Sequence, residues 1–361
     1  METKEILKTI CTEKGISGRE NELYDTMTEL FDGIARIRKK PNGTIIAEIG
    51  DNSSEYHIMF DAHIDRIGLS VTYIDDNGFI KAEPVGGIDL RALPTSAVII
   101  KSTSKLKTTM QNSDGTFGTY NAETNEDIMG IVCAMPPHLT KKEEGLSRDN
   151  IWIDTGLSAD AVKGMVNLGD SVIVKSEFRE MLNHMVTVSA LDNRAGCAAL
   201  IKCAELLQGK NLPCRVSLVF SSQEETNESG AKTAAFELSP DEAIVVDVGF
   251  AKQEGVPNEK SGAIGCGPII SIAPVLSKVI SDTLTEIAGE LTIKCDYEVD
   301  GGGTGTNADG IAVSKGGVPC GVLSIPEKNM HTQTETVSID DIDSVAKILA
   351  EYALRGGIRN A

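Results

Sequence analysis

The first part of the chain changes from helical to β-type apolar spacing. Residues 4–34 show helical spacing twice, interrupted by "GISGRE" at 15–20, and short β-prone runs such as "HIMFDAH" at 57–63 follow. Apolar positions that recur every three to four residues indicate an amphipathic helix, whereas short β-prone runs bounded by turn residues indicate strands. The pattern predicts a helix, a turn, a second helix and then strands of a sheet.

The pattern changes between about residues 72 and 180. Turn signals such as "DDNGF" and "PVGGIDL" separate short strands there, and no long amphipathic helix is expected before residues 158–166. Clusters of Gly, Asn, Asp and Pro mark turns. This segment is therefore predicted to form a separate, small β-rich domain.

After residue 190, helical and β-type patterns alternate. The predicted elements are helix 192–209, strand 215–223, helix 230–238, strand 242–249, helix 274–290, strand 293–299, strand 318–325 and a final helix at about 339–355. Strands that alternate with crossover helices form a mostly parallel sheet covered on both faces. We therefore predict the α/β fold class, with one domain built from residues 1–70 and 181–361 and the β-rich segment 71–180 inserted into it.

Composition and charge narrow the class of protein. The 361 residues are 41% hydrophobic and 24% charged, and the formal net charge of -19 disfavours nucleic acid as a partner, since phosphate backbones attract clustered Lys and Arg. No apolar run approaches the roughly 18 residues of a membrane span, and "METKEILKTI" lacks the features of a signal peptide. We predict a cytoplasmic protein that binds no membrane, and its eight cysteines, which include no CxxC pair, are expected to be buried thiols.

Candidate ligands collect where the predicted strands end. In an open α/β sheet, ligands bind beyond the carboxyl ends of the strands. Five segments deliver acidic or histidine side chains to that edge, and two of the chain's five histidines are among them. The candidates are His63, Asp65, Asp192, Glu224, Glu225, Asp247 and His331. Each alone has an ordinary interpretation as a solvated or structural residue, but together they favour one shared site.

The charges of five candidates fit two divalent ions. Three carboxylates and two neutral imidazoles leave one positive charge on such a pair, which a bridging hydroxide cancels. Those five residues are His63, Asp192, Glu225, Asp247 and His331. Oxygen and nitrogen ligands without thiolates suit Zn, Co or Mn, and ions roughly 3.5 to 4 Å apart can share a carboxylate and activate a water. We therefore predict two divalent metal ions as cofactors.

Glu224 and Glu225 are adjacent and follow the apolar run "VSLVF". A solvated strand end is the ordinary interpretation of such a pair. Successive side chains of an extended backbone point to opposite sides, so Glu225 could bind a metal while Glu224 faces the water as general base. Asp65, two residues after His63, is expected on the same face and could hold or polarise the imidazole, or it could be a solvated turn residue.

A glycine-rich segment, "GGGTGTNADG" at 301–310, precedes a short predicted helix. It lacks the Lys-Ser/Thr ending of a P-loop, which disfavours a phosphate site. A flexible turn is one interpretation. Beside a metal centre, close approach of the backbone to substrate is the better use of glycine, and Gly302, Gly303 and Thr304 are the predicted substrate-binding residues.

Six motifs occur in this order along the chain: "AHID", "SALDNRAGC", "SQEE", "VVDV", "GGGTGT" and "SIPEKNMHT". In this order and at these separations, they resemble the motifs of the tetrahedral or glutamyl aminopeptidases, metallopeptidase family forty-two. Some members of that family carry cellulase or endoglucanase labels. The resemblance covers nearly the whole chain and implies a zinc-peptidase-like catalytic domain with an inserted β-barrel or PDZ-like domain.

The resemblance also implies how the ligands are divided. His63 and Asp247 would hold one ion, Glu225 and His331 would hold the other, and Asp192 would bridge them. Glu224 matches the general base of the family and Asp65 its supporting acid. The peptide that follows the bridging aspartate is often cis in related enzymes. The segment 71–180 matches a dimerisation domain, through which members often assemble into tetrahedral dodecamers.

The resemblance therefore implies a metal-dependent aminopeptidase. It would remove the N-terminal residue from short peptides through a dinuclear centre with a bridging water, and it would form a homo-oligomer. Arg66, Asn193, Asn307 and "TNESG" at 226–230 depart from the family pattern, which leaves substrate preference and assembly open. Two alternatives remain: a glycoside hydrolase, which needs two carboxyl groups and usually no metal, and a noncatalytic assembly protein that uses its inserted domain.

Overall fold

The computed structural model divides the chain into two units. It describes residues 1–50, 54–103, 106–111, 117–122, 127–136, 138 and 147–360. The first unit comprises Met1–Arg66 and Glu177–Ala361, and the second comprises Ile67–Ser176. The predicted boundaries lie four residues later at both ends. The difference arises because β4 (Gly68–Ile74) already pairs with strands of the second unit, whereas β12 (Arg179–Glu180) pairs within the first.

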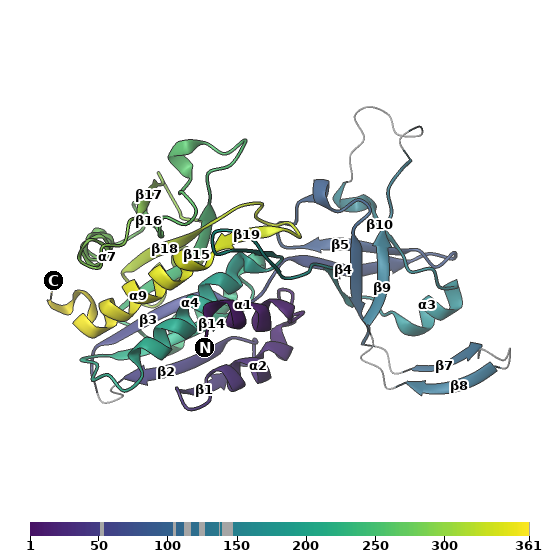
Figure 1. The fold of residues 1–361 in the computed structure, drawn as a ribbon. Coiled ribbons are helices and arrows are strands. Elements are labelled where there is room, and N and C mark those ends of the chain that lie inside the picture. Colours follow the sequence, from purple (N-terminus) through teal and green to yellow (C-terminus); the bar gives the residue numbers. More distant parts are fainter. Residues whose placement is uncertain are drawn as a thin grey trace. The chain divides into compact units, whose positions relative to one another are not determined.

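The first unit is built on an eight-stranded mixed sheet (Figure 1). In spatial order its strands are β1 (Arg36–Lys39), β2 (Ile45–Gly50), β14 (Arg215–Ser221), β3 (His57–His63), β15 (Glu242–Phe250), β18 (Cys320–Glu327), β16 (Ile269–Ile272) and β17 (Asp296–Val299). The central strands β14, β3, β15 and β18 pair in parallel. A smaller sheet contains β12, β13 (Met185–Val188) and β19 (Glu335–Ser338). The predicted α/β class is confirmed, and the parallel part of the sheet is its centre.

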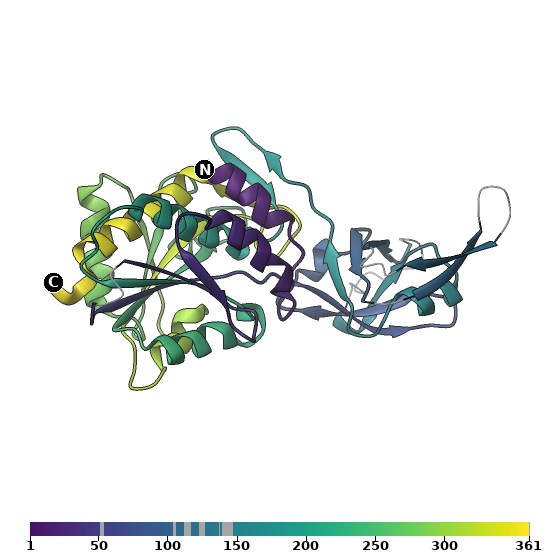
Figure 2. The same ribbon diagram turned by 90° about the horizontal axis from the view of Figure 1, so that it is seen from below.

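Helices cover both faces of this sheet (Figure 2). One face carries α1 (Thr3–Thr12), α2 (Leu23–Leu30), α4 (Leu191–Leu207), α7 (Lys278–Glu290) and α9 (Ile339–Arg355). The other carries α6 (Ser229–Leu238) and α8 (Asn307–Ala312), and a short helix, α5 (Glu224–Asn227), precedes α6. Among the helices of the described residues, none combines the length and apolar character needed to cross a membrane.

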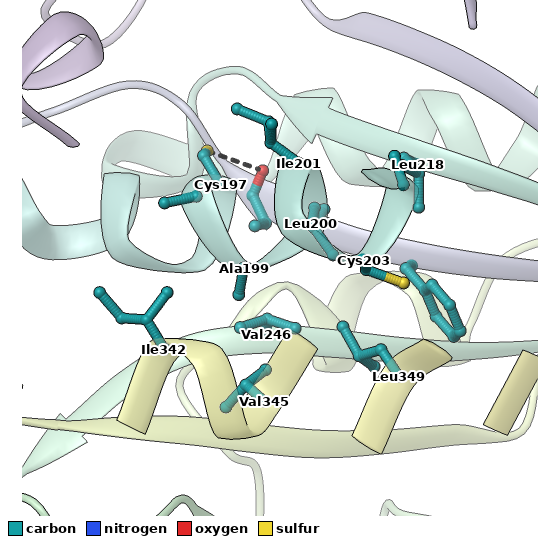
Figure 3. Packing of buried hydrophobic residues seen from close by; sticks show 14 of the residues in the cluster. Cys197, Ala199, Leu200, Ile201, Cys203, Leu218, Val246, Ile342, Val345 and Leu349 are labelled. Carbon is teal, nitrogen blue, oxygen red and sulfur yellow. Dashed lines mark hydrogen bonds between the residues drawn. The ribbon is translucent and has the colours of Figure 1, made fainter. Parts of the chain in front are cut away.

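The core on the first face lies between α4, α9 and the sheet (Figure 3). Leu200 and Cys203 of α4 pack near Val246 of β15 and near Val345 and Leu349 of α9, and all five are buried. Buried apolar side chains of this kind each contribute about 1.5 to 3 kcal/mol relative to the exposed state. The packing therefore fixes α4, and with it the residues at its first turn.

Local sequence signals define the ends of α9. The Ser338 hydroxyl accepts a hydrogen bond from the Asp340 N–H at the first turn, and Gly356 follows the last turn with φ 79°. A Ser N-cap satisfies an N–H that has no helical partner, and Gly adopts the left-handed conformation at low cost. These signals account for the agreement between the predicted helix and the observed bounds.

The second unit is a closed six-stranded barrel. Its strands, in spatial order, are β10 (Ile151–Asp154), β5 (Ile80–Val85), β4, β11 (Ser171–Val174), β6 (Ala97–Lys101) and β9 (Asp127–Val132). The unit also contains the hairpin β7 (Leu106–Gln111) and β8 (Phe117–Ala122) and the helix α3 (Ala159–Met165). Burial alternates along β9, as a strand with one buried face requires. The expected β-rich insert is therefore a barrel.

Candidate metal centre

The parallel strands bring two of the predicted ligands to one edge of the sheet. His63 is the last residue of β3, and Asp247 lies near the end of β15, which pairs in parallel with β3. Both side chains are buried. Because parallel strands end at the same edge, the strand-end argument correctly brings these side chains together.

Asp192 lies between two histidines. Its Oδ1 is 3.0 Å from His63 Nε2, and its Oδ2 is 3.1 Å from His331 Nε2. Asp192 and Asn193 depart from helical backbone at the start of α4, and the peptide between them is cis, as the resemblance implied. Each oxygen of this carboxylate therefore faces a different histidine, which is the arrangement of a bridging ligand.

Two groups of three side chains share Asp192, and within each group the ligand atoms lie within 4.8 Å of one another. The first group adds His63 and Asp247, whose Nε2 and Oδ1 atoms are 3.7 Å apart. The second adds Glu225 and His331, whose Oε1 and Nε2 atoms are 3.6 Å apart. The grouping matches the division between two ions that the resemblance implies.

The chemistry of these side chains fits divalent cations. Imidazole nitrogens and carboxylate oxygens are the donors that Zn, Co and Mn accept. Within the described part of the chain, the buried Oε1 of Glu225 has no hydrogen-bond partner. Burying a charged oxygen without a partner is costly, and a cation between Glu225 and His331 would remove that cost.

Burial and the charges of neighbouring side chains shift the pKa values of the acids in the site. Burial raises the pKa of Glu225 to about 9 and that of Asp247 well above its usual range. Burial alone would also raise the pKa of Asp192, but hydrogen bonds with His331 and His63 lower it below the usual range. Positive charge in the site would lower the raised values, because it stabilises carboxylates. The acids therefore favour bound cations.

Glu224 and Glu225 lie in α5 and not at the end of an extended strand. Gln223 adopts a left-handed conformation with φ 62°, which turns the chain after β14. The argument from strand alternation is therefore wrong. Their side chains still diverge, because adjacent residues of a helix do not face each other. Glu224 Oε2 lies 3.9 Å from His63 Nε2, whereas Glu225 approaches His331.

Asp65 connects the β3 histidine to the two glutamates. Its carboxylate accepts hydrogen bonds from the backbone N–H groups of Glu224, at 3.1 Å, and Glu225, at 3.3 Å. Its Oδ1 lies 3.6 Å from His63 Nδ1, which is closer, at 3.2 Å, to the backbone oxygen of Asp65. Asp65 is fully buried. It therefore positions α5 as well as the imidazole, and a solvated turn residue is excluded.

Three buried charged residues near the site were not predicted. Glu335 accepts a hydrogen bond from the Asp192 N–H at 3.3 Å, and burial raises its pKa to about 8. Both carboxylate oxygens of Glu327 lack a hydrogen-bond partner within the described residues. Arg194 donates to the backbone oxygens of Ile10 and Gly15. Glu327 ends an apolar strand, so the strand-end rule could have found it.

The residues that depart from the family pattern have partners outside the ligand set. Arg66 donates to Ser189 Oγ at 2.7 Å and is buried. Asn193 Nδ2 donates to the backbone oxygen of Val246, and Asn307 Nδ2 donates to Asp61 Oδ2, each at 2.8 Å. These contacts are compatible with the arrangement of the candidate ligands.

Several N–H groups of the glycine-rich segment form hydrogen bonds within the segment. Those of Thr304 and Gly305 donate to the carboxylate of Asp309, at 2.9 and 3.1 Å. Thr304 lines the cavity that contains the candidate ligands, whereas Gly302 and Gly303 are exposed and lie outside its lining. Thr304 is thus the member of the predicted substrate-binding set that reaches the cavity.

The cavity has a volume of about 230 Å³ and contains six of the seven predicted candidates. Asp65 is the exception, since it lies behind the glutamates. Beyond the six candidates, the lining includes Phe250, Ser271, Glu298, Ser324 and Met330. The cavity therefore offers space for a small organic group directly beside the two groups of ligands.

Known proteins resemble the whole chain. The model of the family M42 glutamyl aminopeptidase matches residues 43–119 and 119–348. Lysyl aminopeptidase of Pyrococcus furiosus is 29% identical and covers 95% of this chain and 94% of its own length. Aminopeptidase APDkam598 of the archaeon Desulfurococcus kamchatkensis has a TM-score of 0.85 at 27% identity and covers 99% of this chain and 95% of its own. The TET1 peptidase of Pyrococcus horikoshii has a TM-score of 0.80 at 27% identity, with 98% and 99% covered.

Proposed function

Because the chain belongs to the M42 glutamyl aminopeptidase family and is a metal-dependent aminopeptidase, we propose that it removes the N-terminal residue from short peptides at the site around Asp192. The observation that carries this proposal is the position of the Asp192 carboxylate, with one oxygen near His63 and the other near His331. Such a carboxylate can hold two cations at once.

The side chains divide into two sets of ligands. We assign His63 and Asp247 to one divalent ion, Glu225 and His331 to the other, and Asp192 to both. When bound, Zn, Co or Mn ions at such a site polarise the scissile carbonyl and lower the pKa of a water. The amino terminus of the peptide would be received by one ion and the nearby acids.

Glu224 moves the proton. Its carboxylate takes a proton from the attacking water and passes it to the leaving nitrogen, a role that requires a pKa near the working pH. Burial raises the pKa of Glu224 to about 7 before a cation is bound, and a bound cation would lower it from that value. The hydrogen bond from its own N–H to Asp65 holds Glu224 in place beside His63. Asp65 therefore supports the base through the backbone.

Replacing Glu224 tests this assignment. The Glu224→Gln variant, assayed on aminoacyl p-nitroanilides and short peptides, is expected to lose roughly 10²- to 10⁴-fold in kcat, because an amide cannot accept the proton. Its metal content, measured by mass spectrometry of the elements, is expected to stay unchanged. Glu254→Gln, which alters an exposed glutamate outside the cavity, is the matched control. Retained turnover in Glu224→Gln would refute its role as the base.

We also propose that the inserted unit mediates pairing of subunits in a dimer-based homo-oligomer, up to a dodecamer. The TET1 peptidase of Pyrococcus horikoshii can assemble into a tetrahedron or a large octahedral shell. In this chain, β9 leaves Met129 and Ile131 exposed on the outer face of the barrel, at 46% and 48%. Exposed apolar residues in adjacent positions of one face support a protein interface.

The cysteines support a cytoplasmic location, which we propose for this enzyme. All eight lie in the described residues and are free, and five of them are buried. Free thiols persist in reducing compartments, whereas oxidising ones favour disulfides. The relatives described above carry aminopeptidase or peptidase names. A glycosidase is the alternative, and because glycosidases usually need no metal, loss of activity on metal removal separates the two.

A further inference from the structure

The cavity extends from the ligands across neighbouring strands of the sheet. Asp247 of β15 pairs with Ser324 of β18, and Ser324 pairs with Ile269 of β16. Ser271, two residues further along β16, pairs with Glu298 of β17. Directly paired residues, and residues two apart on one strand, present their side chains to the same face. Asp247, Ser324, Ser271 and Glu298 therefore share one face of the sheet, and all four line the cavity.

Glu298 brings a carboxylate to the end of this row. It is half-buried, and within the described residues it accepts no hydrogen bond and forms no ion pair. The nearby Lys260 instead pairs with Asp300 and donates to the backbone oxygen of Val299. Burial raises the pKa of Glu298, as expected for a carboxylate that lacks a partner. This side chain is thus available to a ligand in the cavity.

No basic side chain lines the cavity beside Glu298, although the positive charge of Lys260 acts on Glu298 from outside the lining and Asp300 opposes it. The lining of the cavity, all of it within the described residues, contains neither Lys nor Arg. Arg66, next to the first unit's candidate ligands in sequence, is buried against Ser189 and does not line the cavity. The chain as a whole carries a net charge of -19. The far part of the cavity therefore attracts cations and repels an acidic side chain.

The separation of Glu298 from the ligands suits a long side chain. Three strand-to-strand steps lead from β15 to β17, which corresponds to roughly 14 Å at about 4.8 Å a step. Lys carries its ammonium on a flexible four-carbon stem, and Arg carries a planar guanidinium that pairs well with a carboxylate. Shorter side chains would leave Glu298 without a partner.

We propose that Glu298 selects peptides whose N-terminal residue is lysine or arginine. The proposal rests on the proposed aminopeptidase function, because it places the scissile peptide at the ligands and the N-terminal side chain along the row that ends at Glu298. Ser271 and Ser324 line the path and give it polar walls. Glu298 is a binding residue and takes no part in the proton transfer.

The experiment compares p-nitroanilides of lysine, arginine, leucine and glutamate on the metal-loaded enzyme. The wild type is expected to have a higher kcat/KM for lysine and arginine than for leucine, and its lowest for glutamate. In Glu298→Gln, the ratio of kcat/KM for lysine to that for leucine is expected to fall by about 10- to 100-fold, the worth of a charge-assisted contact. Glu259→Gln, which removes an exposed charge outside the cavity, is expected to keep the wild-type ratio.

Two further measurements refine the test. Inhibition by free amino acids reports binding without turnover, and dipeptides with lysine before or after the scissile bond report which side of that bond Glu298 recognises. Free L-lysine is expected to inhibit the wild type more strongly than L-leucine does, and this difference is expected to vanish in Glu298→Gln. The kcat/KM for the dipeptide Lys-Ala is expected to fall in Glu298→Gln, whereas that for Ala-Lys is expected to stay unchanged. An unchanged ratio, or a response of Ala-Lys alone, would overturn the proposal. Cleavage of leucine without preference for lysine refutes the selectivity only, whereas failure on all substrates refutes the proposed function.

Discussion

Single residues hold the two glutamates in position. The Asp65 carboxylate accepts hydrogen bonds from the N–H groups of both Glu224 and Glu225, and Glu20 accepts one from Gln223 just before them. Carboxylates that accept backbone N–H groups form stronger hydrogen bonds than neutral acceptors do. The direction of each glutamate is therefore set by buried acids that do not line the cavity.

Another buried residue, His57, makes folding sensitive to acid. Its Nε2 lies 2.8 Å from Ser217 Oγ and its Nδ1 lies 2.8 Å from Arg215, and burial together with that arginine lowers its pKa to about 4. The unfolded state binds a proton near the ordinary pKa of about 6.5, before the folded state does. Stability from neutral His57 is thus fully present above that pH and is lost as the pH falls toward 4.

Unfolding in urea at pH 7 and pH 5 measures this effect. Between these pH values the His57 contribution corresponds to a loss of about 2 kcal/mol in the free energy of unfolding. The side chain of the His57→Asn variant does not titrate in this range. On acidification from pH 7 to pH 5, the free energy of unfolding of this variant is therefore expected to fall by about 2 kcal/mol less than that of the wild type. Equal losses in the two proteins would contradict the pKa assigned to His57. Comparing the pH-dependent difference within each protein cancels the fixed cost of the substitution.

Strand-end reasoning could identify candidate residues but not the contacts between them. It found His63, Asp247 and the adjacent glutamates, because a ligand at the end of an apolar strand leaves a local signal. Glu335 and Arg194 left no such signal, since their partners are distant in sequence and lie in α1, α4 and the loops beside them. The left-handed conformation of Gln223, which turns the chain after β14, could not be predicted, because a polar residue after a strand does not indicate that conformation.

At the scale of elements, the junction of β14, α5 and α6 supports the site. Gly230 at the start of α6 donates its N–H to the backbone oxygen of Ser222, which directly follows β14. A Cβ at Gly230 would lie 2.2 Å from that oxygen and 2.4 Å from the Ser222 nitrogen. Both are backbone atoms, so the junction itself would have to move. The close approach of α6 to β14 therefore depends on glycine at this position.

Gly230→Ala is expected to displace α5 and destabilise the protein. Overpacking of this kind costs about 1 to 3 kcal/mol, and kcat should fall because Glu224 and Glu225 lie within the displaced segment. Gly289→Ala, in α7, is the matched control because an added Cβ there meets no atom within 4 Å apart from its chain neighbours and the adjacent backbone of its own helix. That variant is expected to keep full activity and to gain stability. Unfolding curves and peptidase assays on both variants check this, and an unaffected Gly230→Ala would contradict the role of the junction.

Most long elements could be predicted, whereas some short ones could not. The final helix has the predicted bounds, Ile339 and Arg355, because its capping residues and apolar period agree. The four-residue strands β16 and β19 were missed, since a run of that length carries little periodicity and is held by its neighbours. β16 contributes Ser271 to the cavity, so the missed strand also hid part of the candidate substrate path.

At the scale of the whole molecule, both chain ends build the unit that contains all the candidate ligands. The barrel of Ile67–Ser176 interrupts this unit three residues after the histidine that ends β3. The change from helical periodicity to closely spaced turns predicted the insert. The residue at which the insert begins could not be predicted from this change, because β4 continues the strand-rich pattern of the preceding segment without a break.

We propose that one chain holds two divalent ions around Asp192 and requires them for peptide hydrolysis. The most direct measurement counts metal ions per chain while following aminopeptidase activity, as metal-free protein is titrated with zinc or cobalt. We predict that the metal-free wild type is inactive and that activity becomes full at two ions per chain. The His331→Ala variant is expected to bind one ion per chain and to have little activity. Full activity in metal-free protein, or at a single ion per chain, would contradict the requirement for two ions.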